Sequence, residues 1–205
     1  ALSSVSGVTP APIRALATAP PASNRVCSTI SLEIKLSPSC CALRRACAGI
    51  SATAIYRHYA NREELLFYVL LRGFRIFADY LRRVDENLEP HRLLELTAMA
   101  YLDFALSERP YYEMMFMSSE QVTGFKQLKQ DGVAEMRHTF EILKQRVQRA
   151  IDAGVLRSTD SHSAAFGMWA FAHGQISLYL GGQSEMEKEQ FIHTYQALFS
   201  SYIKG

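Results

Sequence analysis

The distribution of aromatic residues is the feature that most constrains the fold of this chain of 205 residues. The 11 Phe, the 10 Tyr and the single Trp all lie after residue 49. Residues 1–49 instead contain five of the seven prolines and one acidic residue, Glu33. A segment without large apolar side chains buries too little surface to offset its conformational entropy. A folded core is therefore expected only after residue 49.

The first segment, residues 1–48, has three interpretations. It is a flexible tail, a targeting peptide with the acid-poor, Ser- and Arg-containing composition of transit peptides, or foreign sequence that joins the protein near residues 46–49. All four cysteines lie between Cys27 and Cys47, without the spacing of a zinc site or a CxxC redox pair. They are interpreted as free thiols in a reducing compartment or as accidents of that segment. Because no Cys follows Cys47, no disulfide is expected in the remainder of the chain.

From residue 50 onward, apolar residues recur three and four positions apart, which is the helical period. Helices are expected at about 51–58, 61–84, from 90, at 110–117, 132–153, 161–180 and 184–202. Asn61 with Glu64, and Ser184 with Glu187, have the spacing of capping boxes, and Gly154 suits a left-handed C-terminal cap. Because no strand-like alternation occurs, the predicted fold class is all-α.

The stretch "GISATAIYRHYANREELL", residues 49–66, combines a short helix with a cluster of phosphate-binding side chains. Small residues after Ser51 allow close approach to a surface, and a helix N-terminus favours a phosphate. Tyr56 and His58 can donate to phosphate oxygens, and Arg57 can reach a phosphate or a guanine edge. An ordinary solvated helix face explains the same residues equally simply on composition alone.

The motif closely resembles the end of the helix-turn-helix of TetR-family transcriptional regulators. The residues that carry the resemblance are Gly49, Ile50, Ser51, Ile55, Tyr56, His58, Tyr59, Arg62, Glu63 and Leu65. The resemblance implies a recognition helix at about 51–57 and operator DNA as partner. It assigns DNA binding to Ser51, Ala52, Thr53, Tyr56, Arg57, His58 and Arg62.

The resemblance divides the chain into residues 1–48, a helix-turn-helix remnant at 49–66, and a ligand-binding and dimerisation domain at 67–205. Residues 1–48 do not carry in order the Ala/Phe-rich first helix, Gly turn and Thr-containing run that this family has before the motif. The alternative function is therefore a dimeric helical ligand-binding or scaffold module that has lost DNA binding.

The segments "YLDFALSERPYYEMMF" and "MWAFAHG" concentrate aromatic and Met side chains, which suit an adaptable apolar pocket. Plain core packing is the competing interpretation. Both segments resemble a TetR-type C-terminal domain with a Trp-His-Gly pattern, which implies a small-molecule effector. The candidate pocket residues are Tyr101, Phe104, Tyr112, Met115, Phe116, Trp169 and His173.

The last two predicted helices carry apolar residues on more than one side, which is poorly suited to a monomer. We expect a homodimer, as the resemblance also implies, with candidate interface residues Phe171, Leu178, Phe191, Tyr195 and Leu198.

Several functional classes lack a supporting motif. The chain has no Gly-rich phosphate loop, HExxH or GxSxG motif, and its six histidines lack metal-ligand spacing. We therefore predict that it is not an enzyme and that it needs no metal or cofactor. No apolar run is long enough to span a membrane, and a cytoplasmic location is expected. Together with the resemblance, the expected function is a transcriptional regulator whose operator binding is modulated by an apolar or aromatic small molecule.

Overall fold

The computed structural model describes residues 59–117, 130–157 and 160–204 of the chain. Within α4 and α8, the side chains of residues 62–63 and 130–133 lie outside that description. The described residues form helices and connecting turns without a strand, which confirms the expected all-α class. The helices are α4 (Arg62–Arg82), α5 (Pro90–Ser107), α6 (Arg109–Phe116), α8 (Gln130–Asp152), α9 (Ser161–Leu180) and α10 (Lys188–Lys204).

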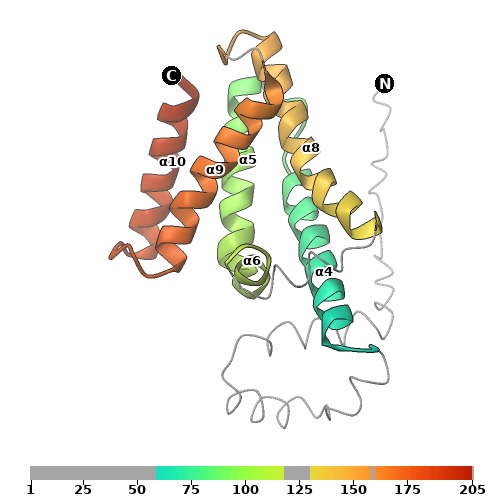
Figure 1. Cartoon of the computed structure of the whole chain (residues 1–205). Coiled ribbons are helices and arrows are strands. Elements are labelled where there is room, and N and C mark those ends of the chain that lie inside the picture. The colour runs from blue at the N-terminus through green and yellow to red at the C-terminus, as the bar shows by residue number, and fades with distance from the viewer. Residues whose placement is uncertain (1–58, 118–129, 158–159, 205) are drawn as a thin grey trace, which may run out of the picture.

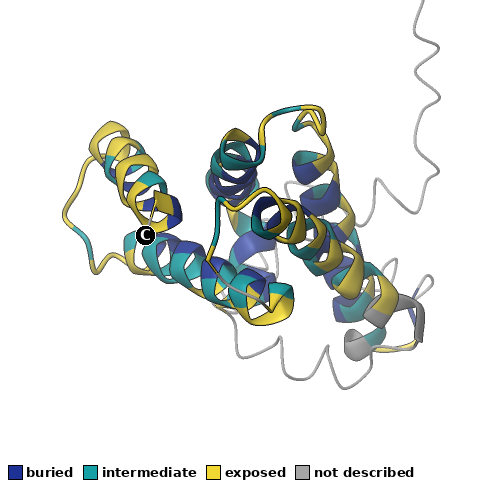
Figure 2. Ribbon diagram, turned by 90° about the horizontal axis from the view of Figure 1, so that it is seen from above, coloured by how far each residue is buried: buried dark blue, intermediate teal, exposed yellow. Residues whose placement is uncertain are grey.

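Helix α5 occupies the centre of the bundle and contacts each of the other described helices. Figure 1 shows α4 and α8 side by side on one flank, with α9 and then α10 on the other. The short helix α6 follows the C-terminal end of α5 and packs against the middle of α4, near Gly73. Figure 2 shows buried residues on the sides of the helices that face one another and exposed residues on the outside. Because α5 is surrounded, it buries residues on several sides rather than along one stripe.

The start of α4 follows the predicted capping arrangement. The Glu64 backbone N–H donates to Asn61 Oδ1 at 2.8 Å, so Asn61 is the N-cap. The Glu64 carboxylate accepts in return from the Ala60 backbone N–H at 2.5 Å, one residue earlier than in an ideal capping box. The apolar stripe of this helix then faces the core through Leu66, Leu70 and the residues that follow.

Two glycines end helices by adopting the left-handed conformation. Gly154 after α8 has φ +71°, as predicted, and the Val155 N–H donates to Ala150 O at 2.8 Å. Gly182 after α9 has φ +72°, and the Gln183 N–H donates to Leu178 O at 3.0 Å. Both are Schellman caps, which satisfy carbonyls that have no partner inside the helix.

The predicted start of the last helix at Ser184 is wrong. Helix α10 begins at Lys188, and Ser184 Oγ accepts a local bond from the Met186 N–H at 3.4 Å. Starting there brings Phe191 onto Tyr179 of α9, with the ring centroids 4.0 Å apart and the planes nearly parallel. A turn bond from Ser to the backbone competes with helix formation, and ring packing decides where α10 begins.

Candidate functional site

A cavity of about 680 Å³ lies inside the helical bundle, between α4, α5, α8 and α9. This volume lies in the range of small-molecule binding sites, roughly 300–1,000 Å³. Helices α6 and α10 each contribute one lining residue, Phe116 and Phe199. Most of the lining is apolar or aromatic: Phe74, Phe77, Leu81, Leu94, Ala98, Tyr101, Phe116, Met136, Phe140, Leu143, Phe166, Met168, Trp169, Ala172 and Phe199.

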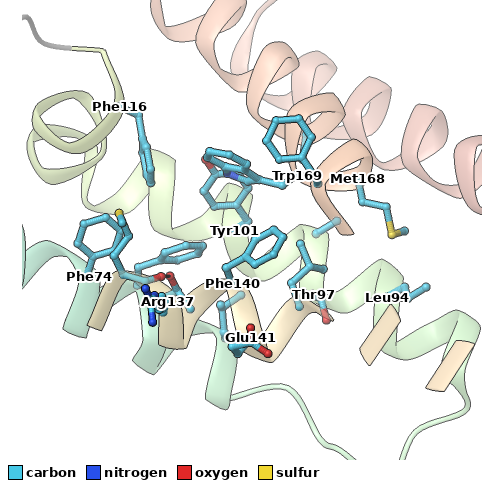
Figure 3. Close-up of a pocket in the computed structure, with 18 of the residues that line it drawn as sticks. Phe74, Leu94, Thr97, Tyr101, Phe116, Arg137, Phe140, Glu141, Met168 and Trp169 are labelled. Atoms are coloured by element: carbon cyan, nitrogen blue, oxygen red, sulfur yellow. Dashed lines mark hydrogen bonds between the residues drawn. The ribbon is translucent and has the colours of Figure 1, made fainter. Parts of the chain in front are cut away.

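The walls follow from helical spacing. Phe74, Phe77 and Leu81 are three and four residues apart on α4, so they lie on one face. On α8, Met136, Phe140 and Leu143 have the same spacing. Two alanines that line the cavity, Ala98 on α5 and Ala172 on α9, are short where larger side chains would fill the core. Figure 3 shows Trp169 and Met168 across the cavity from the side chains of α8.

Aromatic packing stiffens the part of the wall near α6. The rings of Phe77 and Phe104 are stacked with centroids 4.9 Å apart, and Tyr101 lies 5.0 Å from Phe77. Phe116 packs edge-on against Tyr101 and Trp169, each with a centroid distance of 6.3 Å. Such offset and edge-to-face pairs contribute stabilisation beyond buried area, so this wall holds its shape.

A hydrogen-bonded cluster lies directly behind that wall and joins α5, α6 and α9. Tyr101 Oη and Tyr112 Oη lie 3.0 and 2.9 Å from His173 Nδ1, and Ser177 Oγ lies 3.3 Å from His173 Nε2. Burial raises the pKa of both phenols and lowers the pKa of the His173 imidazole. Because the phenols are protonated and the imidazole is neutral, Nδ1 accepts from one phenol and the ring N–H points toward Ser177. The Tyr112 hydroxyl also lies 3.2 Å from Ser177 Oγ.

A buried arginine closes the other side of the cavity wall. Arg146 on α8 donates to Thr97 Oγ1 and to Leu81 O, each at 2.9 Å, and pairs with Glu86 at 2.5 Å. Leu81 and Thr97 line the cavity. The guanidinium therefore connects α8 to α4 through Leu81, to α5 through Thr97, and to the segment between these two helices through Glu86.

The predicted pocket residues occupy different places relative to this cavity. Tyr101, Phe116 and Trp169 line it. Phe104, Tyr112 and Met115 are fully buried and do not line the cavity. His173 contacts three lining residues, because it faces the Tyr101 hydroxyl and its ring packs against Phe116 and Trp169. Sequence reasoning missed the contributions of α4 and α8, including Phe74, Arg137 and Phe140. Their helical spacing marks a core-facing stripe but does not show where the core is empty.

The predicted dimer residues also differ in how far they are exposed. Leu178 and Leu198 are exposed, with 52% and 45% of their surface accessible. Phe171 is half-buried and stacks on Tyr202. Phe191 and Tyr195 are buried within the chain, where Tyr195 donates to Ala98 O. Phe166 on α9 and Tyr202 on α10 add exposed apolar surface that was not predicted as interface.

The predicted DNA-binding residues Ser51, Ala52, Thr53, Tyr56, Arg57 and His58 lie outside the described residues. Arg62 is the first residue of α4, but its side chain is not described. The division at residues 48 and 66 concerns the same region and stays a prediction. Among the described residues there is no cluster of metal-binding side chains, and no helix is long and apolar enough to cross a membrane.

Comparison with known proteins identifies the family. The family described as "Tetracyclin repressor-like, C-terminal domain" matches residues 94–201, which contain most of the cavity lining. The chain belongs to the TetR family of transcriptional regulators. None of the curated proteins matches it. The Trp-His-Gly subtype stays a prediction.

Solved structures share the fold of this TetR-family chain. The TetR-family transcriptional regulator PfmR from Thermus thermophilus is 17% identical with a TM-score of 0.62, over 79% of this chain and 86% of PfmR. A protein of unknown function from Rhodococcus sp. RHA1 is 23% identical with a TM-score of 0.65, over 89% and 93%. A tetR-family regulatory protein from Rhodococcus RHA1 is 16% identical with a TM-score of 0.64, over 87% and 94%.

Proposed function

We propose that this TetR-family regulator binds operator DNA as a homodimer and that an apolar small molecule in the cavity modulates the binding. The observation that carries the proposal is the position of α4. This helix begins at Arg62, inside the motif at 49–66, and its Phe74, Phe77 and Leu81 form one cavity wall. A ligand that contacts α4 acts on the helix that begins inside the DNA-binding motif.

The ligand effect requires two states of the protein. A ligand shifts an equilibrium only by the difference in its affinity for the two states. Filling the cavity favours the arrangement of α4, α5, α8 and α9 that leaves space between them. A different arrangement, in which α4 moves toward α8 and closes that space, has no room for the ligand. We propose that the two arrangements hold the DNA-binding motifs of the dimer at different spacings.

The proposed DNA contacts remain those of the sequence motif. Helix 51–57 enters the major groove, Thr53 and Arg57 face bases, and Tyr56, His58 and Arg62 contact phosphates. Ser51 and Ala52, at the helix start, allow the backbone to approach the DNA. The proposed dimer contact is the exposed apolar surface of α9 and α10, whose members are Phe166, Leu178, Leu198 and Tyr202. The protein acts by binding rather than by catalysis.

A DNA-binding titration tests the proposal. Purified protein is titrated against the DNA upstream of its own gene at several salt concentrations, as wild type, Arg57→Ala, Arg62→Ala and the control Arg157→Ala. Arg157 is exposed and lies far along the chain, after α8. Loss of a phosphate contact weakens binding to all sequences and flattens the salt dependence, whereas loss of a base contact relaxes sequence preference. Absence of specific binding by the wild type would refute the DNA part.

A second function is favoured by one observation. Residues 1–48 lack the pattern that TetR-family proteins carry before the motif, so the chain is alternatively a dimeric ligand-binding or scaffold module without DNA binding. The same titration separates the two. A dimer that binds an apolar ligand but retards no DNA supports the module, and specific retardation supports the regulator.

A further inference from the structure

The hydroxyl groups on the cavity surface are already engaged within the protein. Thr97 Oγ1 donates to Leu93 O at 2.6 Å and accepts from Arg146. Thr139 Oγ1 donates to Met136 O at 2.8 Å. The Tyr101 hydroxyl faces His173 Nδ1. A ligand deep in the cavity therefore meets apolar surface and no hydroxyl that lacks a protein partner.

The charged side chains of α8 that the structure describes have an ion-pair or hydrogen-bond partner, with the exception of Arg137 in the cavity lining. Glu135 pairs with Arg75 of α4 at 3.0 Å, and Glu141 pairs with Lys144 at 3.3 Å. His138 Nε2 accepts from Arg82 at 2.7 Å. Arg137 lines the cavity, is exposed, and makes no ion pair or hydrogen bond with any residue that the structure describes.

The surroundings of Arg137 define what it can bind. Figure 3 shows Arg137 and Glu141 on the α8 side of the cavity, with Phe74 beside Arg137. Glu141 lies one helical turn further along and also lines the cavity, and its carboxylate pairs with Lys144 at 3.3 Å. His162 of α9 lies near by, with its ring 5.2 Å from Phe140. A cationic ligand group would be repelled by this guanidinium, which has no partner among the described residues, whereas an anionic group would pair with it.

We propose that the cavity binds an amphipathic anion, with an apolar body among the aromatic side chains and a single carboxylate on Arg137. The inference rests on the proposed ligand-binding function and names the chemical class of the ligand. Guanidinium and carboxylate match as planar groups with two parallel hydrogen bonds. Since Arg137 is solvent-exposed, the charged end of the ligand lies at the rim and its apolar end lies inside.

The single tryptophan provides the readout, because Trp169 lines the cavity. Trp169 fluorescence is followed while dodecanoate or methyl dodecanoate is added below the micelle concentration. The two probes share a tail and differ in charge. They are titrated into wild type, Arg137→Gln, Arg137→Lys and the control Arg157→Gln, whose parent residue does not line the cavity.

The expected result is that Arg137→Gln weakens dodecanoate binding about tenfold, as for a partly exposed charged hydrogen bond, and leaves the ester unchanged. Arg137→Lys restores part of the loss, and Arg157→Gln has no effect. Equal weakening of both probes, or no weakening of dodecanoate, overturns the inference while ligand binding itself stands. If neither probe nor an uncharged dye such as Nile red binds the wild type, the inference and the proposed ligand-binding function both fail.

Discussion

Two arginines of α8, Arg137 in the cavity lining and Arg146 behind it, have opposite environments although they lie on one helix. Arg146 is almost completely buried, with partners on α4, on α5 and in the segment between them. Arg137 lies nine residues earlier, exposed at the cavity, with no partner among the described residues. One arginine joins three parts of the bundle, and the other has no partner among the described residues.

The difference teaches that residue type alone does not separate structural from functional positions. A buried charge is retained only when its hydrogen-bonding groups are satisfied by the protein, as for Arg146. An unsatisfied charge next to an apolar cavity is stable because water solvates it, and it keeps its donors available. The predictions below test whether the two halves of α8 behave as differently as their contacts suggest.

The largest effect is expected for Arg146→Leu. The substitution leaves Leu81 O and Thr97 Oγ1 buried without their charged donor, so we expect a loss of about 3 kcal/mol in the free energy of unfolding. Glu86 contributes little to that cost, because its side chain is 56% exposed and becomes hydrated. Urea denaturation of Arg146→Leu and Arg137→Leu measures the contrast. A loss of similar size in both variants would abolish the distinction.

Next in size is a pair of substitutions that add the same volume at two places on α9. Ala165 is fully buried away from the cavity lining, whereas Ala172, two turns later, lines the cavity. Ala165→Leu should cost about 2 kcal/mol by overpacking, and Ala172→Leu should cost less than about 1 kcal/mol because its side chain enters empty space. Thermal denaturation checks the order, and Ala172→Leu should also lose ligand binding. Equal costs would mean that the cavity is not open in solution.

A smaller difference is expected for two glycines inside helices. A Cβ on Gly73 of α4 would lie 2.5 Å from the buried Met115 Sδ of α6, whereas a Cβ on Gly174 of α9 meets nothing within 4 Å. Gly73→Ala should lose about 1 kcal/mol, since overpacking outweighs the gain in helix propensity, and Gly174→Ala should gain up to about 1 kcal/mol. Chemical denaturation measures both. Stabilisation by Gly73→Ala would show that Met115 of α6 moves away from the added methyl group at little cost.

The smallest expected effect is a pH dependence that comes from the cluster behind the cavity. Burial lowers the pKa of His173 below its ordinary value of 6.5, so the unfolded chain takes up the proton first. The contribution is therefore fully present above about pH 6.5 and is lost as the pH falls toward the lowered folded-state pKa. The denaturation midpoint should fall between pH 7 and pH 5.5 in the wild type.

The matched variant for this pH effect is His173→Gln, which should show a flatter profile over the same interval. The Asp160 carboxylate, whose pKa is lowered by hydrogen bonds from Ser163 and His162, loses its contribution only below its ordinary value of 3.8. The two groups therefore act in separate pH intervals. An unchanged slope in His173→Gln would show that the ring is as well solvated in the folded protein as in the unfolded chain.

Much of the fold was predictable because helix ends are encoded by neighbouring residues. Asn61 caps α4 and Gly154 ends α8 in the predicted way, since each acts on backbone groups within a few residues. The start of α10 was not predictable, because it depends on the contact of Phe191 with Tyr179 on another helix. Likewise, Tyr101, Phe116 and Trp169 were expected at a pocket, but the roles of Phe140 and Arg137 followed only from the packing of α8.

Local sequence thus determined the all-α class, the caps at Asn61 and Gly154 and the family, because hydrogen bonds within one turn and a contiguous motif need no distant partner. Packing between helices decided where the core stays empty and which arginine is buried. Phe, Met and Ala line the cavity at the same spacing with which they fill the core elsewhere. Only the relative positions of α4, α5, α8 and α9 distinguish a cavity-lining position from a filled core position. A cavity forms where helix surfaces lie too far apart for their side chains to meet, and the residues of a single helix do not determine that distance.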